Sequence, residues 1–136
     1  MGSFSDYMEN ALLNHVFGTG SGNAIAMAHP DKFIALCTVA ITDVSTGTTI
    51  TEPTSPSYAR KQNETWDIST AGATQNTGPI TFKQASADWG TILDFAICDA
   101  LTVGNVLAYG SLTISKSVQS GDTPKFASGD LDITLA

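Results

Sequence analysis

The sequence predicts a mainly β fold, namely an antiparallel β-sandwich of Greek-key or jelly-roll type with one short N-terminal α-helix. Only 14% of the residues are charged, against about 25% in an average domain, and the polar remainder is mainly Thr, Ser, Asn and Gly, which favour strands and turns. Several short segments alternate apolar and polar residues with a period of two, and Gly- and Ser-rich turns separate them. A helical spacing of apolar residues is found near the start of the chain.

The length of 136 residues corresponds to one domain, so we expect a single β-sandwich domain over residues 1–136 with its helix at residues 5–17. Hydrophobic residues make up 42% of the chain, which suffices for a core without a metal or a disulfide framework. The first residues do not form a secretory signal, and the strongest apolar stretch, residues 33–41, is too short to span a bilayer. We therefore expect a soluble protein with no membrane partner.

The charge balance argues against nucleic acid as a partner. Six Lys and Arg residues stand against 13 Asp and Glu residues, which gives a net charge of -7. Binding to a phosphate backbone depends on neutralising Lys and Arg side chains, and an acidic chain repels it. We expect no nucleic-acid binding.

Residues 5–17 carry the pattern of a capped amphipathic helix. Ser5 is placed to cap its N-terminus, and acidic residues follow in the first turn, where the helix dipole favours them. A glycine-rich segment then ends the helix. Because one helix face is apolar, it should pack across an open end of the sandwich or against a neighbouring subunit. Tyr7 and Leu12 are therefore candidate contact residues.

The rest of the chain is expected to form strands joined by polar loops and turns. Pro, Gly and Asn mark the connections, and alternating apolar residues mark the strands. We expect strands at residues 33–41, 58–66, 80–82, 91–98, 106–114 and 131–135, a surface loop at 42–56, a turn region at 72–78 and a hairpin connection at 99–105.

Two of these strands should supply the centre of the core. Both faces of strand 33–41 are apolar, so both should be buried. In strand 91–98 the alternation places Leu93, Phe95 and Ile97 on one face.

The two cysteines, Cys37 and Cys98, lie inside these apolar runs, where a free cysteine behaves as a small buried hydrophobe. A disulfide between them depends on the distance between their Cα atoms, which the sequence leaves open. Nothing in the chain indicates an oxidising compartment.

No motif for catalysis, metal binding or a cofactor is found. His15 and His29 lack the spacing of a zinc site, and no serine lies in a Gly-x-Ser-x-Gly turn. Asp130 and Asp132 flank one residue and could offer two carboxylates to a hard cation, but the calcium-loop pattern does not follow. We expect a non-enzymatic protein with no cofactor and no metal.

Contacts with a partner would fall on the large side chains of two segments. Tyr58, Arg60 and Trp66 share one face of predicted strand 58–66, and Trp89 precedes the next long strand. Large aromatic side chains dominate protein interfaces and the recognition of sugars. The same side chains are also natural core fillers of a small sandwich. Interface and core both remain open for them.

Six segments spread over most of the chain resemble a family of small tailed-bacteriophage virion proteins, often labelled tail fibre or minor structural proteins. The opening segment and residues 87–91 are the most specific of the six. The segments are Phe4 to Phe17, Tyr58-Ala59-Arg60, Ile80-Thr81-Phe82, Ala87-Asp88-Trp89-Gly90-Thr91, Asn105 to Gly110 and Gly129 to Leu135.

The resemblance implies a non-enzymatic structural protein of the virion, assembled in the cytoplasm of the host bacterium. The one-domain length, without a long repetitive shaft, favours a capsid decoration (cement) protein that binds and stabilises the outer head shell. The alternative is a tail-fibre or tail-tip component that attaches to the host, and a carbohydrate-binding module is a third hypothesis. Expected partners are further copies of the chain, in a homotrimer that matches the three-fold axes of a shell, and the major capsid protein or tail proteins.

Overall fold

The computed structural model describes residues 2–17 and 30–135, and these residues form one helix and nine strands. This confirms a mainly β protein with a short N-terminal helix. The elements are β1 (Gly2–Phe4), α1 (Asp6–Phe17), β2 (Phe33–Cys37), β3 (Lys61–Gln62), β4 (Ala73–Gln75), β5 (Ile80–Thr81), β6 (Gly90–Cys98), β7 (Val106–Val118), β8 (Lys125–Phe126) and β9 (Asp132–Thr134).

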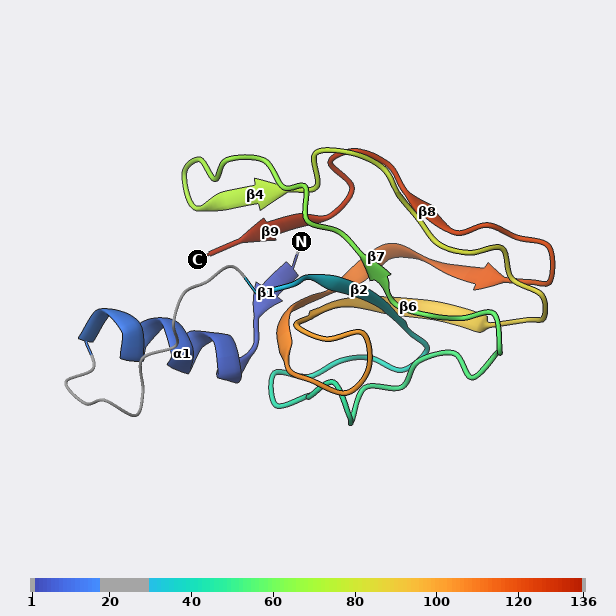
Figure 1. Cartoon of the computed structure of the whole chain (residues 1–136), viewed down its shortest axis with the longest axis horizontal. Helices are drawn as coiled ribbons and strands as arrows, with labels where there is room; N and C mark the ends of the chain where they lie inside the picture. The colour runs from blue at the N-terminus through green and yellow to red at the C-terminus, as the bar shows by residue number, and fades with distance from the viewer. Residues whose placement is uncertain (1, 18–29, 136) are drawn as a thin grey trace.

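Seven strands form one sheet in the order β3-β2-β6-β7-β1-β9-β4, and β5 and β8 form a separate two-stranded ribbon (Figure 1). The paired strands are antiparallel, except that β1 runs parallel to β9 where Gly2 lies opposite Ile133. The β6–β7 hairpin is the longest pairing and occupies the centre of the sheet. Its connection is residues 99–105, as the sequence predicts.

The ribbon of β5 and β8 packs on one face of the sheet and closes the main core. The ring of Phe126 in β8 lies 6.1 Å from that of Phe95 in β6 and 6.3 Å from that of Phe82, in edge-to-face contacts. This two-layer arrangement is consistent with the predicted sandwich, with a second layer that consists of a short ribbon and its flanking segments. The buried residues of this core are Ile34, Leu36, Ile80, Phe82, Ala85, Trp89, Ile92, Phe95, Ile97, Leu107, Ala108, Val118, Leu131 and Ile133.

A smaller cluster covers the opposite face of the sheet. It joins residues of β2, β6 and β7 to Ile41 and Ile50 from the segment that follows β2. Four of the five residues of β2 are buried, because the two clusters cover its two faces. The prediction that both faces of this strand are buried is therefore confirmed for residues 33–37.

The strand 91–98 forms, but Leu93 does not join Phe95 and Ile97 in the core. A register shift between β6 and β7 falls between Ile92 and Asp94, where residues 112–115 of β7 stand opposite Leu93 alone, and Leu93 is 37% exposed. Ile92 takes the core position instead and is 1% exposed. A period-two pattern within one strand cannot anticipate extra residues in its partner strand.

Other elements also differ from the sequence-based prediction: β2 ends at Cys37, β7 continues to Val118, and β8 is an additional strand. Within predicted strand 58–66 only Lys61–Gln62 pairs as a strand, because Tyr58 and Arg60 turn inward to bond with loops. The predicted turn region 72–78 contains the short strand β4. The strand β1 was not predicted, because its pairing with β7 and β9 depends on contacts distant in sequence.

The helix begins where the cap predicts. Ser5 lies just before α1, its Oγ accepts a hydrogen bond from the backbone N–H of Met8 and donates one to the carbonyl of Val106. It thereby caps the helix and ties its start to β7. His29 lies outside the described residues, and the side chain of His15 is not described either. No helix among the described residues is long and apolar enough to cross a membrane.

The cysteines are buried free thiols, as predicted, and the register excludes a disulfide between them. Cys37 lies opposite Asp94, whereas Cys98 lies opposite Phe33 at the other end of the same strand pair. Four residues of strand separate them by about 13 Å, and disulfide-bonded Cα atoms lie within about 7 Å. Burial raises the pKa of Cys37 to about 12 and that of Cys98 to about 11.

We therefore predict that neither thiol reacts with a thiol-specific disulfide reagent at pH 8 while the protein is folded. The thiolate is the reactive form, and at this pH both thiols stay protonated and covered. Both should react within minutes in concentrated urea, which serves as the positive control. Rapid modification of the folded protein would show that the cluster around β2 and β6 is open.

Candidate functional site

Arg60 joins two loops that are far apart in the sequence. Its Nη1 donates to the carbonyls of Ala100 (2.9 Å) and Val103 (2.8 Å), and its Nη2 donates to the carbonyl of Gly47 (2.9 Å). The side chain of Arg60 thus bonds to carbonyl oxygens of two loops, residues 42–50 and 99–105. We call these two loops together the loop end of the molecule.

The positive charge of Arg60 is balanced by Glu52. The Nε and Nη2 atoms of Arg60 contact the two carboxylate oxygens of Glu52, and the closest pair is 2.8 Å apart. Burial alone would lower the pKa of Arg60, but the hydrogen bonds and charge of Glu52 raise it, so the guanidinium stays charged. Arg60 is 6% exposed and is therefore a buried cation whose bonds are satisfied inside the chain.

Tyr58 and Trp89 extend this network into the main core. The hydroxyl of Tyr58 donates to Glu52 (2.6 Å) and accepts from the N–H of Leu36 (2.9 Å). Burial and the bond to Glu52 both raise the pKa of Tyr58, so it stays protonated. The rings of Tyr58 and Trp89 meet edge to face at 5.2 Å, and the Trp89 indole N–H donates to Ser57. Tyr58 thus links Arg60, which lies beneath the loop end, to Trp89, which lies at the other end of β6 and bonds through its backbone N–H to the carbonyl of Val118.

The two loops of the loop end approach one another at a glycine. The N–H of Gly47 donates to the carbonyl of Gly104 at 3.1 Å. A Cβ atom at position 47 would lie 1.8 Å from the carbonyl oxygen of Val103, a distance that no side chain tolerates. Only glycine permits this packing of backbone on backbone.

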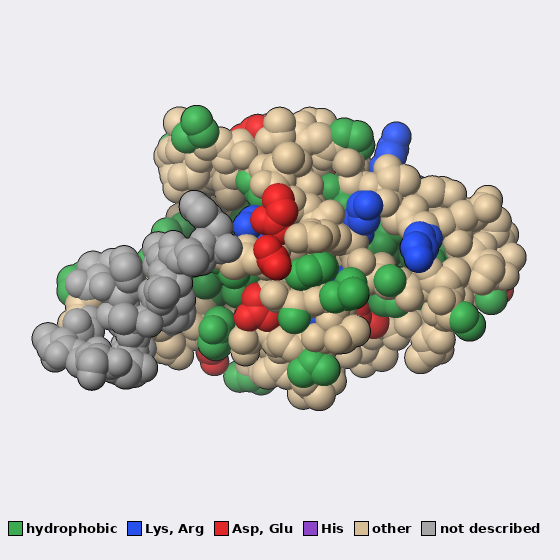
Figure 2. Space-filling view, viewed as in Figure 1, with side chains coloured by type: hydrophobic (Ala, Val, Ile, Leu, Met, Phe, Trp, Pro, Cys, Tyr) green, Lys and Arg blue, Asp and Glu red, His purple; other side chains and the backbone are tan. Residues whose placement is uncertain are grey.

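The surface of the loop end is apolar at its tip. Val103 has φ of 57°, which is a rare and strained conformation for a β-branched residue, and its side chain is 60% exposed. Leu101 (52%) and Val44 (74%) are exposed on the same pair of loops. Figure 2 shows hydrophobic side chains on the surface over the lower loops of the molecule. Arg60 and Gly47 therefore hold an exposed apolar tip in a strained backbone.

The helix carries the other two predicted contact residues. Tyr7 is 45% exposed and Leu12 is partly buried, so only Tyr7 presents a large part of its side chain to solvent. Beside Tyr7, the exposed carboxylates of Asp6, Glu9 and Asp43 have oxygen atoms within 4.8 Å of one another. A hydrogen bond with Asp43 and the repulsion between their charges raise the pKa of Asp6.

Trp66 lies apart from Tyr58, Arg60 and Trp89, at a hollow of about 650 Å³ between β1 and the segments around β4 and β9. Its indole N–H donates to the carbonyl of Asn63 at 3.1 Å. An ion pair of 3.0 Å between Lys32 and Glu64 lies at the same hollow. Burial opposes ionisation of Glu64, but the amide and ammonium of Lys32 outweigh it and lower its pKa.

Asp130 and Asp132 were considered in the sequence as ligands for a hard cation. Asp130 accepts a hydrogen bond from the N–H of Ala127 at 2.7 Å, which closes the turn before β9. Asp132 lies exposed in β9. Asp67, near the hollow of Trp66, accepts bonds from Thr77 and Gln75, which lower its pKa.

Sequence reasoning missed three residues on which the loop end depends, namely Glu52, Gly47 and Val103. Glu52 is one of two acids in the Thr-, Ser- and Pro-rich segment 42–56, and its position eight residues before Arg60 was a usable signal. The roles of Gly47 and Val103 follow from a contact between loops more than 50 residues apart, and no local pattern indicates such a contact.

The β scaffold thus carries, at its loop end, exposed apolar side chains on two ordered loops. Residues 3–134 match the family Gp80, described as "Podophage GP4 fiber I protein gp80". The chain therefore belongs to this family of tailed-phage virion structural proteins, which confirms the resemblance seen in the sequence. No curated protein matches the chain.

We predict that Arg60→Ala lowers the free energy of unfolding by about 3 kcal/mol, because it leaves Glu52 and three carbonyls without their donor. Urea unfolding followed by tryptophan fluorescence measures the change. The matched control is Lys61→Ala, an exposed neighbour in β3, which should shift stability by less than about 0.5 kcal/mol. Equal stability of the two variants would contradict the structural role of Arg60.

We also predict that Asp6 titrates above its ordinary pKa of 3.8 and that Asp43→Asn returns it toward that value. A raised pKa means that the folded protein holds this proton more tightly. The associated stabilisation is therefore present below the ordinary pKa and is lost as the pH rises through the raised one. Carboxyl NMR measures both values, with Asp67 as the control that Asp43→Asn should leave unchanged. An ordinary pKa for Asp6 in the unmodified protein would refute the prediction.

Proposed function

We propose that this chain is a fibre subunit attached to the tail of a tailed phage. The support is the description of its family as a podophage fibre protein, over a match that covers residues 3–134. Fibre subunits act by contact, and we propose that this chain does so without catalysis.

This proposal departs from the capsid decoration role that the one-domain length favoured. A short chain without a repetitive shaft is compatible with either place in the virion, because a small subunit can assemble on a tail as well as on a shell. The family description supports the fibre, and nothing in the described residues favours a head shell.

We propose further that the loop end is the surface through which the subunit meets its neighbours, including other copies of the chain in a homotrimer. The observation that supports this is the strained Val103, held by the carbonyl contacts of Arg60 and Gly47 while its side chain remains exposed. Strain in a backbone is kept where function requires a fixed geometry. A preordered apolar tip binds with a smaller loss of conformational entropy than a mobile one.

Separation of purified virions into heads and tails, followed by quantitative mass spectrometry, tests the place of the chain. A fibre subunit is expected in the tail fraction, at a few copies to a few tens of copies for each virion. Hundreds of copies in the head fraction would overturn the fibre in favour of capsid decoration.

Val103→Asn tests the loop end, because asparagine tolerates a positive φ and is polar. We predict that this variant is at least as stable as the unmodified chain, by up to about 1 kcal/mol, since strain is relieved. Its incorporation into virions should nevertheless fall at least tenfold.

The matched control is Val39→Asn, which changes another exposed valine, 54% exposed, in the segment that follows β2. This variant should be incorporated normally. Normal incorporation of Val103→Asn would remove the loop end as a contact surface, whatever the outcome of the fractionation.

A further inference from the structure

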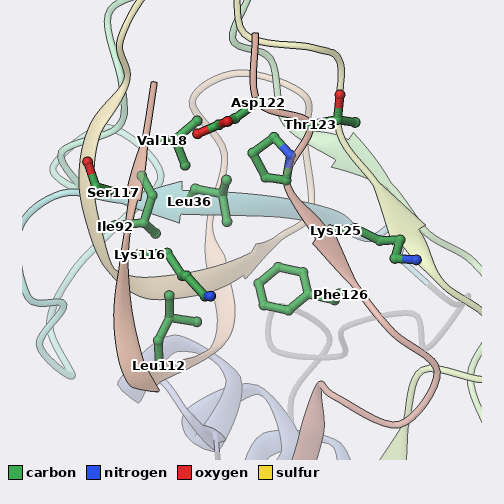
Figure 3. A pocket seen from close by; sticks show the side chains of 11 residues that line it. Leu36, Ile92, Leu112, Lys116, Ser117, Val118, Asp122, Thr123, Lys125 and Phe126 are labelled. Carbon is green, nitrogen blue, oxygen red and sulfur yellow. The ribbon is translucent and has the colours of Figure 1, made fainter. Parts of the chain in front are cut away.

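A groove lies at the opposite end of the β6–β7 hairpin from the loop end. It has a volume of about 420 Å³ and runs between the last residues of β7 and the segment that leads into β8. In Figure 3, Lys116 and Ser117 lie on one side of the groove and Thr123 and Lys125 on the other. Its apolar lining is supplied by Leu36, Ile92, Leu112, Val118, Pro124 and Phe126.

One wall of the groove is a free strand edge. In the ribbon, Thr81 of β5 lies opposite Lys125 of β8, and the N–H of Phe82 donates to the carbonyl of Pro124. Bonded and non-bonded pairs alternate along an antiparallel ribbon, so the N–H and C=O groups of Thr123 and Lys125 point away from β5. None of these four groups bonds to another group in the described part of the chain.

The groove also gathers positive charge in an acidic protein. Of the six Lys and Arg residues in a chain of net charge -7, Lys32 and Arg60 are engaged in ion pairs. Within residues 2–17 and 30–135, neither Lys116 nor Lys125 has a carboxylate within 4.0 Å. Asp122 also lines the groove, and its carboxylate accepts a bond from the N–H of Gln119 at 2.9 Å. The two ammonium groups therefore remain available for an anionic partner.

We propose that this groove binds an extended acidic peptide segment of a neighbouring virion protein. The segment adds as a strand along β8 and pairs with the backbone of Thr123 and Lys125. Alternate side chains of the segment then face opposite ways, one set onto the apolar lining and the other outward. Its carboxylates pair with Lys116 and Lys125. The inference does not depend on whether the subunit belongs to the tail or the head.

The free edge is the reason to favour a peptide over an acidic sugar. An exposed row of backbone donors and acceptors is complementary to another strand. A sugar would instead stack on a broad aromatic face, and both tryptophans lie elsewhere, Trp66 at the other hollow and Trp89 in the core.

The test uses two synthetic hexapeptides on the full chain, one that alternates glutamate with valine and one that alternates lysine with valine. Calorimetry should show the glutamate peptide to bind at least tenfold tighter. Its binding should slow hydrogen exchange at the amide of Lys125, which is the signature of backbone pairing. Lys116→Ala and Lys125→Ala should each weaken binding at least threefold, whereas Lys61→Ala, the matched control on β3, should not.

Several outcomes would overturn the proposal. They are the absence of binding by the glutamate peptide, equal binding of the two peptides, and binding without protection of the Lys125 amide. Binding of an oligoglucuronate in place of the peptide would assign the groove to an acidic sugar instead. None of these outcomes bears on the head-and-tail fractionation, so the two proposals fail separately.

Discussion

The buried guanidinium of Arg60 is the interaction on which the loop end depends. A buried cation is costly unless it is paired and its N–H groups are bonded, and here Glu52 supplies the charge while three carbonyls complete the bonding. Those carbonyls come from two loops with little regular structure of their own. The requirement to satisfy one side chain therefore fixes the geometry of both loops, and the close approach at Gly47 and the strain at Val103 follow from it.

The main features of the fold were predictable because they are local. The helix and its cap at Ser5, the β2 run and the β6–β7 hairpin each carry a periodic pattern that a short window contains. The missed features depend on distant contacts. Leu93 left the core because four residues of β7 oppose a single residue of β6 there, and β1 became a strand because β7 and β9 lie on its two sides.

The large side chains singled out from the sequence have structural positions that the sequence did not indicate. Tyr58, Arg60 and Trp89 were selected as large side chains suited to an interface or a core, and the structure buries Arg60 beneath the loop end and Trp89 in the main core, with the partly buried Tyr58 between them. Composition cannot distinguish a residue on a contact surface from a buried residue that positions a loop. The exposed residues, Leu101 and Val103, are ordinary aliphatic residues in a turn-rich segment, and their significance appears only with their backbone geometry.

The two ends of the central hairpin thus offer different chemistry, an apolar tip at one end and a basic groove with a free strand edge at the other. We propose that the loop end is preordered for contact within the virion. Hydrogen exchange of the backbone amides, compared between the isolated chain and intact virions, tests this proposal. We expect slower exchange in virions at residues 99–105 and 42–50. Unchanged exchange in both loops would contradict it.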